Sequence, residues 1–193
     1  PRPDELAAGA DAARLAARAI AADPPTAGRI VGRRPASAAA RRVAASRGRV
    51  HLERGLDALA IGAVLARASG ADPADAGEAA ALRDLGLAAG DDSRRHALAG
   101  ADRLLAASRP AAVVAAIAAH HERLDGSGQP RGIAVDELGS LERIVALVDV
   151  LVAMTRRDVA GGLPIAEAFR ALRMALAGRF DGRLVLALAG LIA

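Results

Sequence analysis

The chain contains almost no aromatic side chains, with two Phe, no Tyr and no Trp among 193 residues. Its interior must therefore be built from Ala, Leu, Val and Ile. Ala and Leu are strong helix formers, whereas strands are enriched in aromatic and β-branched residues. The composition favours close-packed helices over a sheet, and a chain of this length can bury a substantial core. We expect an all-α fold.

Charge and cysteine content narrow the classes of partner. All basic residues are Arg, and the net charge of +4 permits an anionic ligand without indicating nucleic acid. The lack of aromatic stacking residues also counts against nucleic acid binding. The absence of Cys excludes thiolate metal sites and disulfides. No apolar run is long enough to span a membrane, and acidic residues near the start argue against a signal peptide. We expect a cytoplasmic protein, cut from a longer chain.

Apolar residues recur at helical spacing along nearly the whole sequence. Residues 122–139 are rich in Gly and are predicted to form one long loop. The pattern divides the chain into an Ala- and Arg-rich helical extension or linker at 1–46 and a main domain at 47–193. Within 29–49, seven Arg and no carboxylate form either a solvated helix face or a contact surface for an upstream domain, a partner or an anionic polymer. The predicted helices are 4–22, 35–46, 51–67, 73–86, 93–108, 111–121, 141–155, 164–177 and one from 181.

Two features indicate a polar site inside the bundle. Asp149 has apolar neighbours on both sides in the chain, and burying an ionised carboxylate there is costly unless a metal or a basic partner compensates. Capping of another helix or pairing with a buried Arg in a purely structural role is the alternative. His120 and His121 precede the Gly-rich loop, where they either bind a metal or complement a helix dipole.

The four His of the chain lie in a recognisable order with acidic residues. Residues 120–132 read HHERLDGSGQPRG and match the pattern HHExxDGSGxPxG. With His51, the dipeptide Arg83-Asp84, His96 and Asp149 in sequence, residues 47–193 resemble the HD-GYP family. Its members are bacterial metal-dependent phosphodiesterases that hydrolyse cyclic di-GMP, within the HD phosphohydrolase superfamily. The resemblance implies an HD-domain helical bundle that takes part in cyclic dinucleotide signalling.

The resemblance also implies roles for individual residues. A first metal would be held at His51, the HD dipeptide and Asp149, and a second at Asp84, His96, His120 and His121. Asp84 would bridge the two ions and act as the catalytic residue. Iron, manganese and zinc all accept such ligands. Substrate contacts are implied at Gly128, Pro130, Arg83 and Arg143.

The chain departs from the family pattern at decisive positions. The His of the HD dipeptide is Arg83, which stays protonated and cannot bind a metal. We expect Arg83 to place a fixed charge where the first metal would lie, paired with Asp149 or Asp84, or else to bind a phosphate bidentately. Further departures lie at Arg47, Leu87, Gln129, Asp158 and Gly161. Leu87 stands where the resemblance implies a Lys, a cation near the substrate.

The second-metal ligands are intact, so we expect one divalent ion or none. Two interpretations of the function remain. The chain is either a weakened phosphodiesterase with a single-metal site, or an inactive signalling domain that binds a partner or a nucleotide without turnover. The expected partners are a cyclic dinucleotide or a related phosphoester and an upstream sensor or receiver domain. A helical scaffold protein unrelated to the family is a distant third.

Overall fold

In the computed structural model, the described residues are 49–87, 95–155, 162–192 and five N-terminal positions, with only the backbone described for 49–54 and 191–192. These residues form seven α-helices and one short 3-10 helix, and no strand occurs among them, which confirms the all-α fold. The elements are α4 (Arg49–Ser69), α5 (Pro73–Leu82), α6 (His96–Ala106), α7 (Ala111–Ala118), η1 (Val135–Glu137), α8 (Ser140–Met154), α9 (Ile165–Met174) and α10 (Gly182–Ile192).

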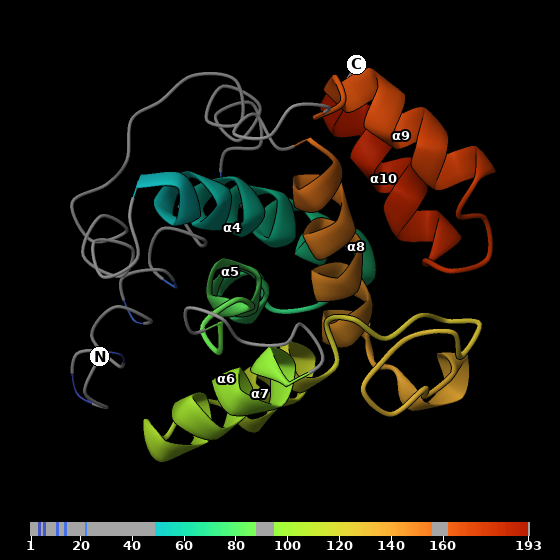
Figure 1. Cartoon of the computed structure of the whole chain (residues 1–193). Coiled ribbons are helices and arrows are strands. Elements are labelled where there is room, and N and C mark those ends of the chain that lie inside the picture. The colour runs from blue at the N-terminus through green and yellow to red at the C-terminus, as the bar shows by residue number, and fades with distance from the viewer. Residues whose placement is uncertain are drawn as a thin grey trace.

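Helix α8 is the centre of the bundle. It packs against α4, α5, α7, α9 and α10. Figure 1 shows α8 running between α4 and α5 on one side and the paired helices α9 and α10 on the other. Its inner residues Ile144, Leu147 and Leu151 are fully buried. Asp149 therefore lies on the helix that most of the other helices surround.

Small residues allow α4 and α5 to approach closely. A Cβ atom at Gly62 would lie 2.9 Å from the carbonyl oxygen of Ala76 and 3.0 Å from Cβ of Ala80. Ala76 and Ala80 are themselves fully buried. The contact between α4 and α5 is thus made by small side chains, in agreement with the Ala-rich composition.

Among the helices that end earlier than their apolar pattern predicts, α5 and α7 are followed directly by candidate site residues. The start of α5 agrees with the prediction, because Oδ1 of Asp72 accepts hydrogen bonds from the backbone of Ala74 and Asp75 at 2.7 and 3.0 Å. Its end lies at Leu82, not near residue 86. Helix α7 ends at Ala118, so the His pair lies in the turn that follows it.

Some predictions lie outside the described residues. These are the helix over 35–46 and residues 93–94 at the start of the helix over 93–108. Most of the helix over 4–22 and the Arg-rich segment 29–49 also lie outside them. Among the described residues, no helix combines the length and the apolar character needed to cross a membrane.

Candidate metal centre

The turn after α5 brings the acidic residue Asp84 to the start of α6. A Cβ atom at Gly86 would lie 1.8 Å from the carbonyl oxygen of His96, so only Gly allows the turn to approach the helix so closely. This contact places Oδ1 of Asp84 3.7 Å from Nε2 of His96. Asp84, from the turn after α5, and His96, from the start of α6, therefore lie in one site.

Three His side chains meet beside Asp84. His96 is the first residue of α6, and His120 and His121 come from the turn after α7. Their ring centroids are 4.0 to 5.0 Å apart. One ring nitrogen from each His lies within 4.8 Å of the others, a spacing that could hold a metal ion. The structure thus brings together three of the four predicted His ligands.

One ring nitrogen of His120 is free of a proton. Its Nδ1 lies 2.6 Å from the carbonyl oxygen of Ile117, and because a carbonyl only accepts, Nδ1 carries the hydrogen. Burial lowers the pKa of His120 to about 4, so the ring is neutral near pH 7. Nε2 therefore presents a lone pair, 3.0 Å from Nε2 of His96.

His121 is oriented in the same way by an acidic residue. Its Nδ1 lies 3.2 Å from Oδ2 of Asp149, to which it donates. Its Nε2 is buried and has no hydrogen-bond partner among the described residues. Metal-binding His residues commonly donate their other ring nitrogen to a carboxylate or a carbonyl, as His120 and His121 do here. A cation in this cluster would supply the partner that His121 Nε2 lacks.

Asp149 is the ionised centre of a charged network. Burial alone would raise its pKa, but the hydrogen bond from His121 and the charge of Arg83 hold the pKa well below its usual range. Nε of Arg83 lies 3.1 Å from Oδ1 of Asp149. The pairing expected for Arg83 is therefore present.

Arg83 itself is buried between two carboxylates. Its side chain is 3% exposed, and its second carboxylate contact is with Oδ2 of Asp84 at 3.2 Å. It also donates to the carbonyl oxygen of Ala80 at 2.9 Å. The guanidinium stays protonated under all ordinary conditions. It therefore supplies a permanent positive charge between Asp84 and Asp149.

The donor set suits one divalent ion better than two. The three His with Asp84 nearby offer nitrogen and oxygen ligands that iron, manganese or zinc accept. A second possible group, formed by Asp84, His120 and Asp149, shares two of its members with the Arg83 network. Because Arg83 already pairs with both carboxylates, a second cation there would meet a fixed positive charge.

Buried Glu122 shapes the loop after the His pair, a role that the sequence analysis did not assign. It accepts from the backbone nitrogens of Arg131 and Ile133 at 2.7 and 3.2 Å. Gly128 lies against it, since a Cβ atom there would be 2.4 Å from Cα of Glu122. Gln129, next to Pro130, donates its backbone nitrogen to the carbonyl of His121 at 3.1 Å. The loop thus folds back onto the turn that carries the His pair.

Arg143 holds the far side of the same loop. It donates to the carbonyl oxygens of Leu138 and Val135, each at 2.8 Å, and lies 3.2 Å from Asp181. These contacts indicate that Arg143 positions the loop. They do not test the substrate contact predicted for it.

Several other predicted positions fall outside the described part of the site. His51 lies in α4, but its side chain is not described. Arg47, Asp158 and Gly161 lie outside the described residues. Leu87 ends the turn after α5, where its backbone nitrogen donates to the carbonyl of Asp84 at 3.0 Å. An apolar side chain stands there in place of the family's cation.

Comparison with known proteins agrees with this geometry. The family model described as "HD domain" matches residues 78–184, more than half of the chain. A cyclic di-GMP phosphodiesterase of Pseudomonas aeruginosa is 42% identical over 91 residues, which are 46% of this chain and 22% of that protein. A 3'3'-cGAMP-specific phosphodiesterase of Vibrio cholerae is 39% identical over 66 residues, 33% of this chain and 15% of that protein. The matches thus span less than a quarter of these relatives.

A solved structure shows the same fold. An HDG"Y"P protein from Bdellovibrio bacteriovorus superposes with a TM-score of 0.62 at 18% identity, covering 95% of this chain and 70% of that one. At this identity the likeness concerns the fold alone. The expected HD-type helical bundle and the resemblance to cyclic dinucleotide phosphodiesterases are both confirmed.

Proposed function

The chain belongs to the HD domain family, and we propose that it binds a cyclic dinucleotide or a related phosphoester at a centre that holds one divalent metal, with hydrolysis slow or absent. The relatives that it matches act on cyclic di-GMP and 3'3'-cGAMP, according to their names. Both compounds are phosphodiesters whose anionic groups require positive charge in a binding site. The proposal extends this chemistry to the site of the present chain.

The contact of Arg83 with Asp149 and Asp84 carries the proposal. An Arg at this position removes one ligand and adds a charge of the same sign as the missing ion. Both carboxylates that would have served the first metal are engaged by Arg83, at 3.1 and 3.2 Å. His120 and His121 each keep one ring nitrogen available for a metal, within 4.8 Å of a ring nitrogen of His96.

Each residue of the centre then has a distinct task. His96, His120, His121 and Asp84 would hold the metal, and Asp149 would orient His121. When bound, such an ion would polarise a phosphoryl oxygen and lower the pKa of a bound water. Arg83 would add positive charge beside the phosphoester without generating a nucleophile. With one ion instead of two, activation of water and neutralisation of the leaving oxygen would no longer be shared between two cations.

Complete absence of turnover, the limiting case of this proposal, is favoured by a specific observation. Arg83 is nearly fully buried and already paired with two carboxylates, so its charge is balanced within the protein. Leu87 replaces a further cation near the substrate. Under this interpretation the domain would bind a partner or a nucleotide and relay its presence.

Parallel measurement of binding and turnover tests the proposal. The manganese-loaded chain is titrated with cyclic di-GMP and with 3'3'-cGAMP by calorimetry, and product is followed by chromatography over hours. A His121→Ala variant serves as the control that lacks one metal ligand. We expect binding that this variant loses, with slow or no product. Absence of binding to either compound would contradict the proposal, and rapid hydrolysis would contradict the assigned effect of Arg83.

A further inference from the structure

Helix α5 carries a second buried charge network, which shares no residue with the candidate metal centre. Glu78 is fully buried in the middle of α5. Its Oε1 lies 2.8 Å from Nε of Arg109, and its Oε2 lies 3.0 Å from Nη2 of the same residue. A two-point contact of this kind fixes both position and orientation. It joins α5 to the segment between α6 and α7.

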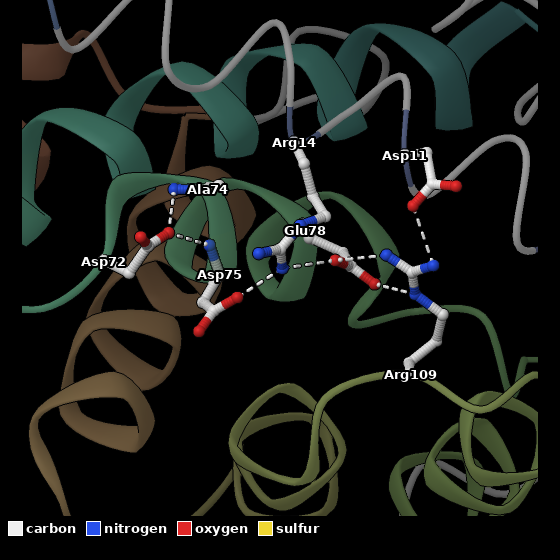
Figure 2. Close-up of polar contacts among 7 residues, drawn as sticks. All are labelled: Asp11, Arg14, Asp72, Ala74, Asp75, Glu78 and Arg109. Carbon is white, nitrogen blue, oxygen red and sulfur yellow. Dashed lines mark hydrogen bonds and ion pairs between the residues drawn. The ribbon is translucent and has the colours of Figure 1, made fainter.

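Residues from the N-terminal segment complete this network. Nη1 of Arg14 lies 3.0 Å from Oε2 of Glu78 and also contacts Asp75, while Oδ1 of Asp11 lies 2.8 Å from Nη1 of Arg109. Figure 2 shows Arg14 and Asp11 reaching from the N-terminal segment toward Glu78 and Arg109. Arg14 thus pairs with Glu78 of the bundle, and Asp11 pairs with Arg109.

An apolar contact accompanies these charges. Leu6 is 4% exposed and belongs to the same hydrophobic cluster as residues of α4, α5 and α8. We call Leu6, Asp11 and Arg14 the N-terminal clasp. All three lie outside residues 78–184, the part that the HD domain model matches.

Helix α5 connects the clasp to the metal centre. Glu78 precedes Arg83 by five residues, about 7.5 Å along a helix axis. Helix α5 ends at Leu82, and Arg83 and Asp84 follow in the turn, with Gly86 packed on His96. A small displacement of α5 would thus reach Arg83, Asp84 and the start of α6 together, because packed helices move as rigid units.

We propose that the N-terminal clasp is a regulatory contact, which by docking on Glu78 and Arg109 holds α5 where Arg83 lies between Asp149 and Asp84. Release of the clasp would leave the buried Glu78 with Arg109 alone and would loosen the turn that carries Arg83 and Asp84. The position of the N-terminal segment would in this way set the geometry of the metal centre. This inference rests on the proposed function only where it concerns metal affinity.

Amide hydrogen exchange of the metal-free chain tests the coupling without reference to metal or activity. The Arg14→Ala variant is compared with the unmodified chain and with Arg170→Ala, whose side chain is 70% exposed and has its only described ion pair at 3.9 Å from Glu167. We expect Arg14→Ala to speed exchange in residues 73–87 at least about fivefold, with α9 and α10 unchanged. Arg170→Ala should leave residues 73–87 unchanged.

Two results would overturn the proposal. Faster exchange confined to the N-terminal segment would mean that the clasp does not stabilise α5 or the turn after it. A uniform increase over all helices would mean that Arg14 contributes only to global stability. If Arg14→Ala does not fold, Asp11→Asn provides the same comparison, because it removes one clasp contact while Arg14 and Arg109 still serve Glu78.

Manganese titration provides the second arm. Arg14→Ala should weaken manganese binding at least about fivefold relative to the unmodified chain and to Arg170→Ala. Equal manganese affinity in the three proteins would overturn the link to the metal centre. If the unmodified chain binds no manganese, the proposed function fails, and the exchange experiment still decides the clasp. Light scattering checks that the clasp acts within one chain, since a dimer dissociated by Arg14→Ala would instead place it between two copies.

Discussion

Arg83 and Asp149 hold each other inside the bundle, with Nε of Arg83 3.1 Å from Oδ1 of Asp149. The other oxygen of the same carboxylate lies 3.2 Å from Nδ1 of His121. One carboxylate therefore neutralises a buried guanidinium and orients an imidazole. Under the proposed function, Arg83 takes the place of a metal ion, and Asp149 orients His121 instead of binding that ion.

Replacing Asp149 by Asn should reduce the free energy of unfolding by about 3 kcal/mol, because Arg83 would lose the buried one of its two counter-charges. Metal affinity should fall about 10- to 100-fold, since His121 would lose its acceptor. Urea unfolding and manganese titration measure the two effects. Asp136→Asn, at an exposed position in η1, is the matched control and should change neither. Unchanged stability in Asp149→Asn would contradict the buried pairing.

Replacing Arg83 by His should allow a second metal to bind, because an imidazole would stand where the guanidinium now excludes a cation. Arg83→Leu is the control, which removes the charge without adding a ligand and should not gain an ion. Metal content by mass spectrometry after loading with manganese compares the variants. If Arg83→His holds no more metal than Arg83→Leu, the position assigned to Arg83 is wrong.

The metal-free protein should lose stability as pH falls from about 6.5 to about 4. Burial lowers the pKa of His120 to about 4, whereas the unfolded chain takes up this proton near the ordinary value of about 6.5. In that window the unfolded state binds more protons, so the free energy of unfolding falls with pH, by up to about 3 kcal/mol. Because the pKa of Asp149 is lowered, its contribution to the free energy of unfolding should persist until the pH falls below the ordinary pKa of an Asp side chain.

Urea unfolding at several pH values in EDTA measures this dependence. His120→Gln should show a smaller slope between pH 6.5 and 4 than the unmodified chain, because the titrating group is absent. An identical slope in the two proteins would assign the pH dependence to other groups.

Replacing Gly86 by Ala should destabilise the bundle by about 3 kcal/mol, the upper part of the range for overpacking, because the added Cβ would lie 1.8 Å from the carbonyl oxygen of His96. Gly190→Ala is the control. It lies in α10 with open space at the Cβ position and should be stabilised by up to about 1 kcal/mol. Thermal unfolding compares them, and equal changes in the two variants would contradict the close packing of the turn on α6.

The sequence predicted the bundle well because its helices are punctuated by local signals. Asp72-Pro73 marks the start of α5, and the Gly-rich segment marks the loop after the His pair. Helix ends were harder to predict, since the apolar pattern of α5 continues past Leu82 into a turn that depends on the contact of Gly86 with α6. Such a contact between distant segments leaves no periodic signal.

The same reasoning that selected Asp149 would have selected Glu78, a carboxylate with apolar neighbours in the Ala-rich helix α5. Its partners Arg109 and Arg14 lie 31 and 64 residues away in the chain, and no spacing rule connects them. The pairing of Arg83 was predictable because the resemblance placed it beside Asp149. The role of Glu122 was not, because its acceptor contacts are with backbone nitrogens that any residue supplies.

The metal content of the purified chain tests the central claim most directly. After loading with manganese or iron and removal of excess metal, mass spectrometry gives the number of ions per chain. One ion per chain, lost in His121→Ala, is the predicted result. Two ions per chain would contradict the replacement of a metal by Arg83, and none would contradict the centre formed by His96, His120 and His121.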